Sequence, residues 1–112
     1  MTAFSIIIAV IWLVGGALLL WVGIKAGKGT LPRNEWVGIR TPELKASDQA
    51  WVTGHKAAAP LLTATAVPLL IGGILCFIAD DSMASWISLA VAVVMLLLLF
   101  SASAKAKKAV RS

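Results

Sequence analysis

Three uncharged apolar runs constrain this chain more than any other feature of its sequence. They cover about residues 3–24, 57–79 and 84–103. At about 1.5 Å per residue, the first run forms a helix about 33 Å long, which crosses a hydrocarbon core of roughly 30 Å. Lipid cannot satisfy backbone polar groups, so each run must form an α-helix. The sequence therefore predicts an all-α integral membrane protein with three transmembrane helices in a single membrane domain, residues 1–112.

Composition excludes the soluble classes of protein. Hydrophobic residues make up 60% of the chain and charged residues 13%, against roughly 25% charged in an average soluble domain. The lone cysteine, Cys76, excludes an internal disulfide and a cysteine metal cluster. No Lys or Arg precedes the first run, which is also longer than the apolar part of a signal peptide, so we expect it to remain as an anchor.

The basic residues predict the orientation of the spans. All ten Lys and Arg lie in residues 25–56 or in residues 104–112, and the connection after residue 79 carries only Asp80 and Asp81. The positive-inside rule makes the long segment a cytoplasmic loop and the last segment a cytoplasmic tail, with the N-terminus outside. Lys105, Lys107 and Lys108 are expected to continue the third helix, where they control topology or bind anionic lipid headgroups at about 1 kcal/mol each.

Small residues predict where the spans meet, because close packing drives helix association in lipid. Ala9, Gly16 and Gly23 recur every seven residues in the first span, and Ser88 and Ala92 share a face of the third. Trp12, in the middle of the first span, favours a helix-packing role. No ionisable residue lies inside a span, which argues against a pump or secondary transporter.

The cytoplasmic loop contains two helix-start signals. Thr41 is a typical N-cap, and Pro42 suits the first helical position. Ser47 followed by Asp48 gives a second start, from which residues 48–59 are amphipathic. We expect this amphipathic helix to lie along the inner membrane surface and to lead into the second span near Pro60.

Several loop side chains have a physical interpretation. Gly38 permits a tight turn or a close approach to a helix, and Asn34 can brace that turn. Arg40 is suited to pair with a lipid phosphate, with Glu43 or with Asp48. His55 can form a hydrogen bond across the loop or stack on Trp51. The two loop tryptophans, Trp36 and Trp51, are expected to anchor the loop at the membrane interface.

A resemblance rests on these same residues. Asn34 and the run Gly38-Ile39-Arg40-Thr41-Pro42 are followed by Ser47-Asp48, Trp51 and His55. This order and spacing resemble the signature of the SdpI family, bacterial membrane proteins named for an immunity protein against a secreted sporulation-delaying toxin. The resemblance covers about residues 34–60 closely, with compatible spans on either side. The named immunity protein is larger and has additional spans.

The resemblance implies a small non-enzymatic protein of the bacterial inner membrane. Its role would be immunity to a toxin peptide, or signalling, through the spans and the inner loop. A loop folded on itself for purely structural reasons is the alternative. The residues show no catalytic, metal or cofactor pattern, because there is one histidine, no Ser-His-Asp order and no phosphate-binding glycine loop.

A second hypothesis follows from the small size and the small-residue seams. It makes the chain an accessory subunit of a larger membrane complex, such as a respiratory or envelope-synthesis complex. The expected partners are membrane lipids and a protein, either that complex or a toxin peptide. Nucleic acid is not expected, because the positive charge is explained by topology.

Overall fold

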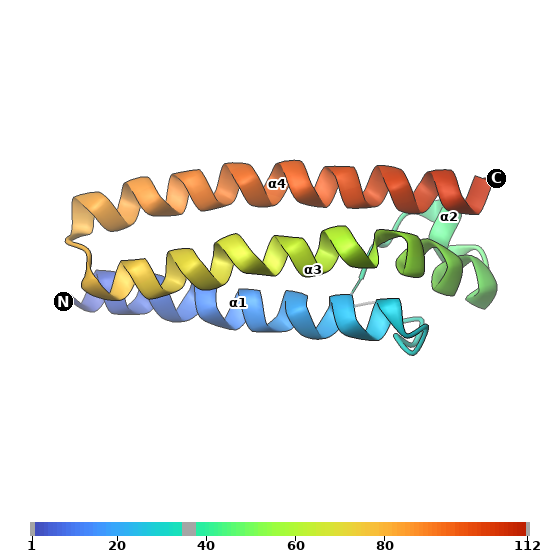
Figure 1. The fold of residues 1–112 in the computed structure, drawn as a ribbon, viewed down its shortest axis with the longest axis horizontal. Helices are drawn as coiled ribbons and strands as arrows, with labels where there is room; N and C mark the ends of the chain where they lie inside the picture. The colour runs from blue at the N-terminus through green and yellow to red at the C-terminus, as the bar shows by residue number, and fades with distance from the viewer. Residues whose placement is uncertain (1, 35–37, 112) are drawn as a thin grey trace.

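The computed structural model describes residues 2–34 and 38–111. Its helices are α1 (Ala3–Gly27), α2 (Pro42–Lys45), α3 (Asp48–Ile78) and α4 (Asp81–Arg111). Figure 1 shows the three long helices side by side along one axis. All three are long and apolar enough to cross a membrane, which confirms the predicted all-α membrane fold.

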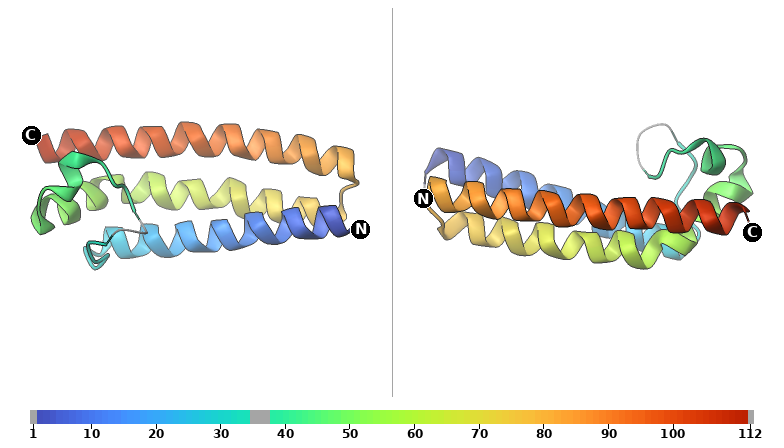
Figure 2. Two further views of the ribbon diagram at one scale, coloured as in Figure 1. Left: turned by 180° about the vertical axis from the view of Figure 1, so that it is seen from behind. Right: turned by 90° about the horizontal axis from the view of Figure 1, so that it is seen from above.

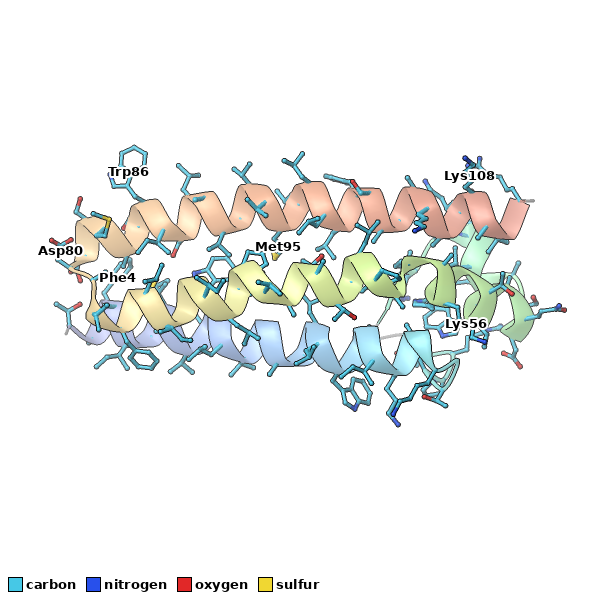
Figure 3. All side chains as sticks on the ribbon, viewed as in Figure 1. Phe4, Lys56, Asp80, Trp86, Met95 and Lys108 are labelled. Atoms are coloured by element: carbon cyan, nitrogen blue, oxygen red, sulfur yellow. The ribbon has the colours of Figure 1, made fainter. Side chains whose placement is uncertain are left out.

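The two ends of the bundle differ. The N-terminus and the short turn between α3 and α4 lie at one end, which we call the turn end. The C-terminus, α2 and the segment after α1 lie at the other, which we call the loop end (Figures 1 and 2). Figure 3 places Lys56 and Lys108 at the loop end and Asp80 at the turn end.

Local hydrogen bonds explain where the helices begin. The Thr41 hydroxyl accepts the Leu44 N–H, with Pro42 in the first helical turn, and the Ser47 hydroxyl accepts the Ala50 N–H at 3.0 Å. Both predicted helix starts are therefore confirmed. At the turn end, the Asp80 carboxylate accepts the Met83 N–H at 2.8 Å and so caps α4.

The amphipathic segment 48–59 is not a separate surface helix, and here the prediction needs correction. It forms the first turns of α3, which continues without interruption through Pro60. Proline at this position frees the carbonyl of Lys56. The 31 residues of α3 span about 46 Å, so the helix extends beyond the hydrocarbon core. Water can therefore satisfy that carbonyl. Trp51 and His55 are buried within the protein.

Small residues let α1 and α3 pack closely. Ala9, Gly16 and Gly23 are all buried in α1. A methyl group added at Gly16 would lie 2.8 Å from a Leu70 methyl carbon, and one added at Gly23 would lie 2.9 Å from the backbone nitrogen of Thr63. These glycines therefore set the distance between the two helices.

The helix α4 packs mainly on α3 and barely touches α1. Its Ser88 and Ala92 are half-buried. The Ser88 hydroxyl accepts the indole N–H of Trp12 at 2.9 Å and so links α4 to α1. This bond confirms the helix-packing role of Trp12. The outer faces of α1 and α4 expose large apolar side chains, including Ile7, Val14 and Phe100, as lipid contact requires.

Candidate functional site

A small hydrophobic core closes the loop end of the bundle. The Trp51 side chain is 1% exposed, and its indole N–H donates to the Leu31 carbonyl at 3.1 Å. From α2, the fully buried Leu44 packs over Gly54, where an added methyl group would lie 2.7 Å from Leu44. We call this cluster the loop-end core, and its buried members are Val22, Ala26, Leu31, Leu44, Trp51, Ala58, Ala59, Leu62, Ala102 and Ala106.

His55 joins the loop to α3 through both ring nitrogens. Its Nε2 accepts the backbone N–H of Ile39 at 2.8 Å, and its Nδ1 lies 2.8 Å from the Trp51 carbonyl. An N–H donor requires a lone pair on Nε2, so the proton is on Nδ1 and is donated to Trp51. The imidazole also packs against the Trp51 indole, with ring centroids 4.2 Å apart and ring planes tilted by 36°. His55 is therefore held as the neutral Nδ1–H tautomer.

Gly38 is where the chain passes over these two rings. Its φ of +114° disfavours any residue with a side chain. A Cβ built there would lie 2.7 Å from Nε2 of His55 and 3.0 Å from Cζ2 of Trp51. The tight turn and the close approach to a helix that were predicted for this glycine both occur.

The polar residues of the motif lie at the surface around this core. Asn34 donates its side-chain amide to the Pro32 carbonyl at 2.7 Å, two residues earlier in the chain. Arg40 is exposed. Of its predicted acidic partners, Asp48 is paired with Arg33 at 3.3 Å. Within residues 2–34 and 38–111, Arg40 forms no ion pair with either Asp48 or Glu43.

Both loop tryptophans, Trp36 and Trp51, were expected to anchor the loop at the membrane interface. Trp51 is not an interfacial anchor, because its ring is buried under Gly38 and its N–H is bonded to protein backbone. Trp36 lies outside the described residues.

The three lysines of the tail lie on the last turns of α4, which continues to Arg111 as expected. Lys105 and Lys108 are exposed, and Lys107 is half-buried.

Sequence reasoning missed three residues that hold the site together. They are Leu31, Leu44 and Gly54, which all contact the first turns of α3 or lie within them. Leu44 had a visible signal, because it is a single leucine between Glu43 and Lys45. An apolar residue isolated in a charged loop is a candidate for burial.

Comparison with known protein families gives a match, which covers most of the chain after α1. A family model described as the SdpI/YfhL protein family matches residues 30–104, two thirds of the chain. The chain belongs to the SdpI/YfhL family. The matched region of this SdpI-type protein includes the whole motif and every residue of the loop-end core except Val22, Ala26 and Ala106. No curated protein and no solved structure matches the chain significantly.

The described part of the site has neither a metal-binding cluster nor a histidine nitrogen free for proton transfer. Within residues 2–34 and 38–111, no three His, Cys, Asp or Glu side chains are placed to hold a metal ion. The imidazole of His55 has both nitrogens committed to backbone groups. The arrangement is a packed scaffold with an exposed arginine beside it.

Stability of the site should depend on pH through His55, which lies on the turns of α3 before the predicted span. Burial lowers the pKa of the imidazole below 6.5, and the bond to the Trp51 carbonyl opposes this shift only in part. As pH falls below about 6.5, the unfolded chain takes up a proton that the folded chain refuses, so the free energy of unfolding decreases. Above that pH, the full contribution of neutral His55 to the free energy of unfolding is present.

Unfolding in mixed detergent micelles with increasing dodecyl sulfate, between about pH 7.5 and pH 5, measures this effect. A His55→Gln variant is the control, because it has no imidazole to titrate. If wild type and variant lose the same free energy over that range, His55 is not the group responsible.

Proposed function

We propose that this SdpI-type protein is non-enzymatic and protects the bacterial inner membrane against a toxic peptide, or reports its presence, through its spans and its loop end. One observation carries the proposal. The motif divides into two buried rings, Trp51 and His55, over which Gly38 passes, and an exposed arginine, Arg40. A general acid or base needs a nitrogen free to exchange protons with substrate, and His55 offers none. The arrangement supports recognition rather than catalysis.

The distribution of charge supports an orientation with the loop end in the cytoplasm. Lys56 and Lys108 lie at that end, and Asp80 lies at the opposite end (Figure 3), directly before Asp81 at the start of α4. By the positive-inside rule, the charges at the two ends of the bundle favour the same orientation, with the N-terminus outside and the C-terminus inside. A peptide arriving from outside would then meet the spans first, and the loop end would pass the signal to a cytoplasmic partner.

Rescue of a deletion strain tests the role of Arg40. Cells without the protein should be sensitised to a secreted peptide, and the wild-type gene should restore survival. We expect Arg40→Ala to reduce survival at least about tenfold, because a charge-assisted hydrogen bond contributes about 1.5–3 kcal/mol. Lys28→Ala is the matched control, since it removes one exposed positive charge from the same end of the bundle. Membrane levels of all variants are compared by immunoblot. Full rescue by Arg40→Ala at normal membrane levels contradicts the proposed role.

A second candidate function is that of an accessory subunit in a larger membrane complex. The specific observation is an apolar groove of about 370 Å³ between α3 and α4, which has Pro68, Gly72 and Val91 among its lining residues. Such a groove can accept a helix of another subunit. Purification of the tagged protein from its own membranes in mild detergent decides between the two. A large complex of fixed stoichiometry favours the subunit, and recovery alone excludes it.

A further inference from the structure

We propose that Arg40 marks a binding site for one anionic phospholipid. The lipid phosphate would occupy a cationic cavity beside the motif, and one acyl chain would occupy an apolar groove on α4. The inference comes from the shape and charge of the loop end. It concerns the same arginine as the proposed protection role, but its test measures lipid binding by the purified protein rather than survival of cells.

The cationic cavity is the first of two spaces that Arg40 lines. It has a volume of about 330 Å³ and is lined by Arg33, Asn34, Arg40 and Lys45. No carboxylate is among the lining residues that the structure describes. Arg33 is paired with Asp48 at its edge, whereas neither Arg40 nor Lys45 forms an ion pair within the described residues. Arginine binds phosphate through two parallel hydrogen bonds, so a phosphate suits this cavity.

The apolar groove is the second space that Arg40 lines. It has a volume of about 420 Å³, with residues 38–41 on one wall and Leu96, Leu99 and Phe100 of α4 on the other. Leu96 and Phe100 are exposed on α4, within the predicted third span. The groove therefore opens toward the hydrocarbon of the bilayer, where acyl chains are the available occupants.

Arg40 lines both spaces, and this juxtaposition selects the ligand. A soluble anion would fill the cavity and leave the groove empty. An uncharged apolar segment would fill the groove and leave the cations unpaired. An amphiphile with a phosphate at one end and a hydrocarbon chain at the other matches both spaces at once. An anionic phospholipid of the same leaflet has that chemistry.

Native mass spectrometry of the purified full-length protein tests the site. The protein in mild detergent is titrated with phosphatidylglycerol and, separately, with phosphatidylcholine carrying the same acyl chains. Wild type should bind one phosphatidylglycerol with a clear preference. Arg40→Gln should weaken that binding about fivefold, the effect of one cation near a lipid surface. Leu96→Trp should weaken it several-fold by filling the groove.

Two matched controls accompany these variants. Lys28→Gln removes a charge at the same end of the bundle but away from the cavity. Leu97→Trp adds the same bulk to α4 at a residue that is 64% exposed and does not line the groove. All four positions are at least partly exposed, so circular dichroism should show unchanged helix content.

The outcomes separate the sources of affinity. Loss of the preference for phosphatidylglycerol in Arg40→Gln and weaker lipid binding in Leu96→Trp, with both controls at the wild-type level, support the lipid site. Equal losses in Arg40→Gln and Lys28→Gln show general electrostatics and overturn it. An effect of Arg40→Gln without any effect of Leu96→Trp, together with displacement by inorganic phosphate, shows an anion site only and also overturns it.

Discussion

Replacing Trp51 with alanine is expected to lower the free energy of unfolding by about 3–5 kcal/mol, the usual cost of truncating a buried aromatic residue. The indole is the largest fully buried side chain described. Its removal leaves a cavity under Gly38, deprives the Leu31 carbonyl of its donor and removes the ring against which His55 packs. The loss is measured by titration with dodecyl sulfate in mixed micelles, followed by circular dichroism.

Two further tryptophan variants separate packing from hydrogen bonding. Trp51→Phe retains most of the ring but loses the N–H, so it should cost about 1 kcal/mol beyond the change in volume. Trp86→Ala is the control, because Trp86 is 67% exposed on α4. Its effect should stay well below that of Trp51→Ala. Equal losses at the two positions would show that Trp51 is not packed as the structure has it.

Replacing Gly23 with alanine is expected to destabilise the protein by about 1–3 kcal/mol, the cost of overpacking a close helix contact. In the middle of a helix, this change normally gains up to 1 kcal/mol, since alanine has the higher helix propensity. At Gly23 the added methyl group would meet the hydroxyl of Thr63 and lie 2.9 Å from its backbone nitrogen and 3.0 Å from its Cα. Backbone atoms cannot rotate away, so α1 and α3 must separate.

Gly27→Ala is the matched control, four residues further along the same helix. A methyl group there would lie 3.4 Å from Cβ of Ala59, an ordinary van der Waals contact. We expect its effect on the free energy of unfolding to remain within about 0.5 kcal/mol of zero. A stabilising effect at Gly23 would mean that the two helices are not in close contact at that point.

The spans were predictable because bilayer thickness, rather than sequence detail, dictates the length of an apolar run. Helix starts at Thr41 and Ser47 were predictable for another reason. A cap depends on side chains and N–H groups only three residues apart. The spacing of Ala9, Gly16 and Gly23 likewise indicates one helix face before any partner is known.

The continuation of α3 through Pro60 was not predictable from local rules. Proline is usually a boundary because it leaves a carbonyl unpaired. The cost of that unpaired carbonyl depends on how deep Pro60 lies in the membrane. This depth follows only from the full 31-residue length of α3. The partner of Trp12 was equally hidden. The bond to Ser88 joins residues 76 positions apart, and no local pattern specifies such a pair.

The candidate site was predictable residue by residue but not as an assembly. Gly38 and His55 were recognised as a turn and a hydrogen-bonding ring. Their meeting depends on Leu31 and Leu44, which tie the loop down over Trp51. Contacts between residues so far apart in the chain leave no regular spacing in the sequence. Trp51 was therefore expected at the membrane interface instead.

The motif scaffold depends on a neutral His55 whose Nε2 accepts the Ile39 N–H, and nitrogen NMR of the imidazole tests this most directly. His55 is the only histidine in the chain, so the ¹⁵N-labelled protein needs no assignment of its ring signals. At about pH 7.5 the structure predicts a single Nδ1–H tautomer, with Nδ1 protonated and Nε2 carrying a lone pair. A fast-exchanging mixture of tautomers, or a proton fixed on Nε2, would contradict a loop held to α3 by this ring.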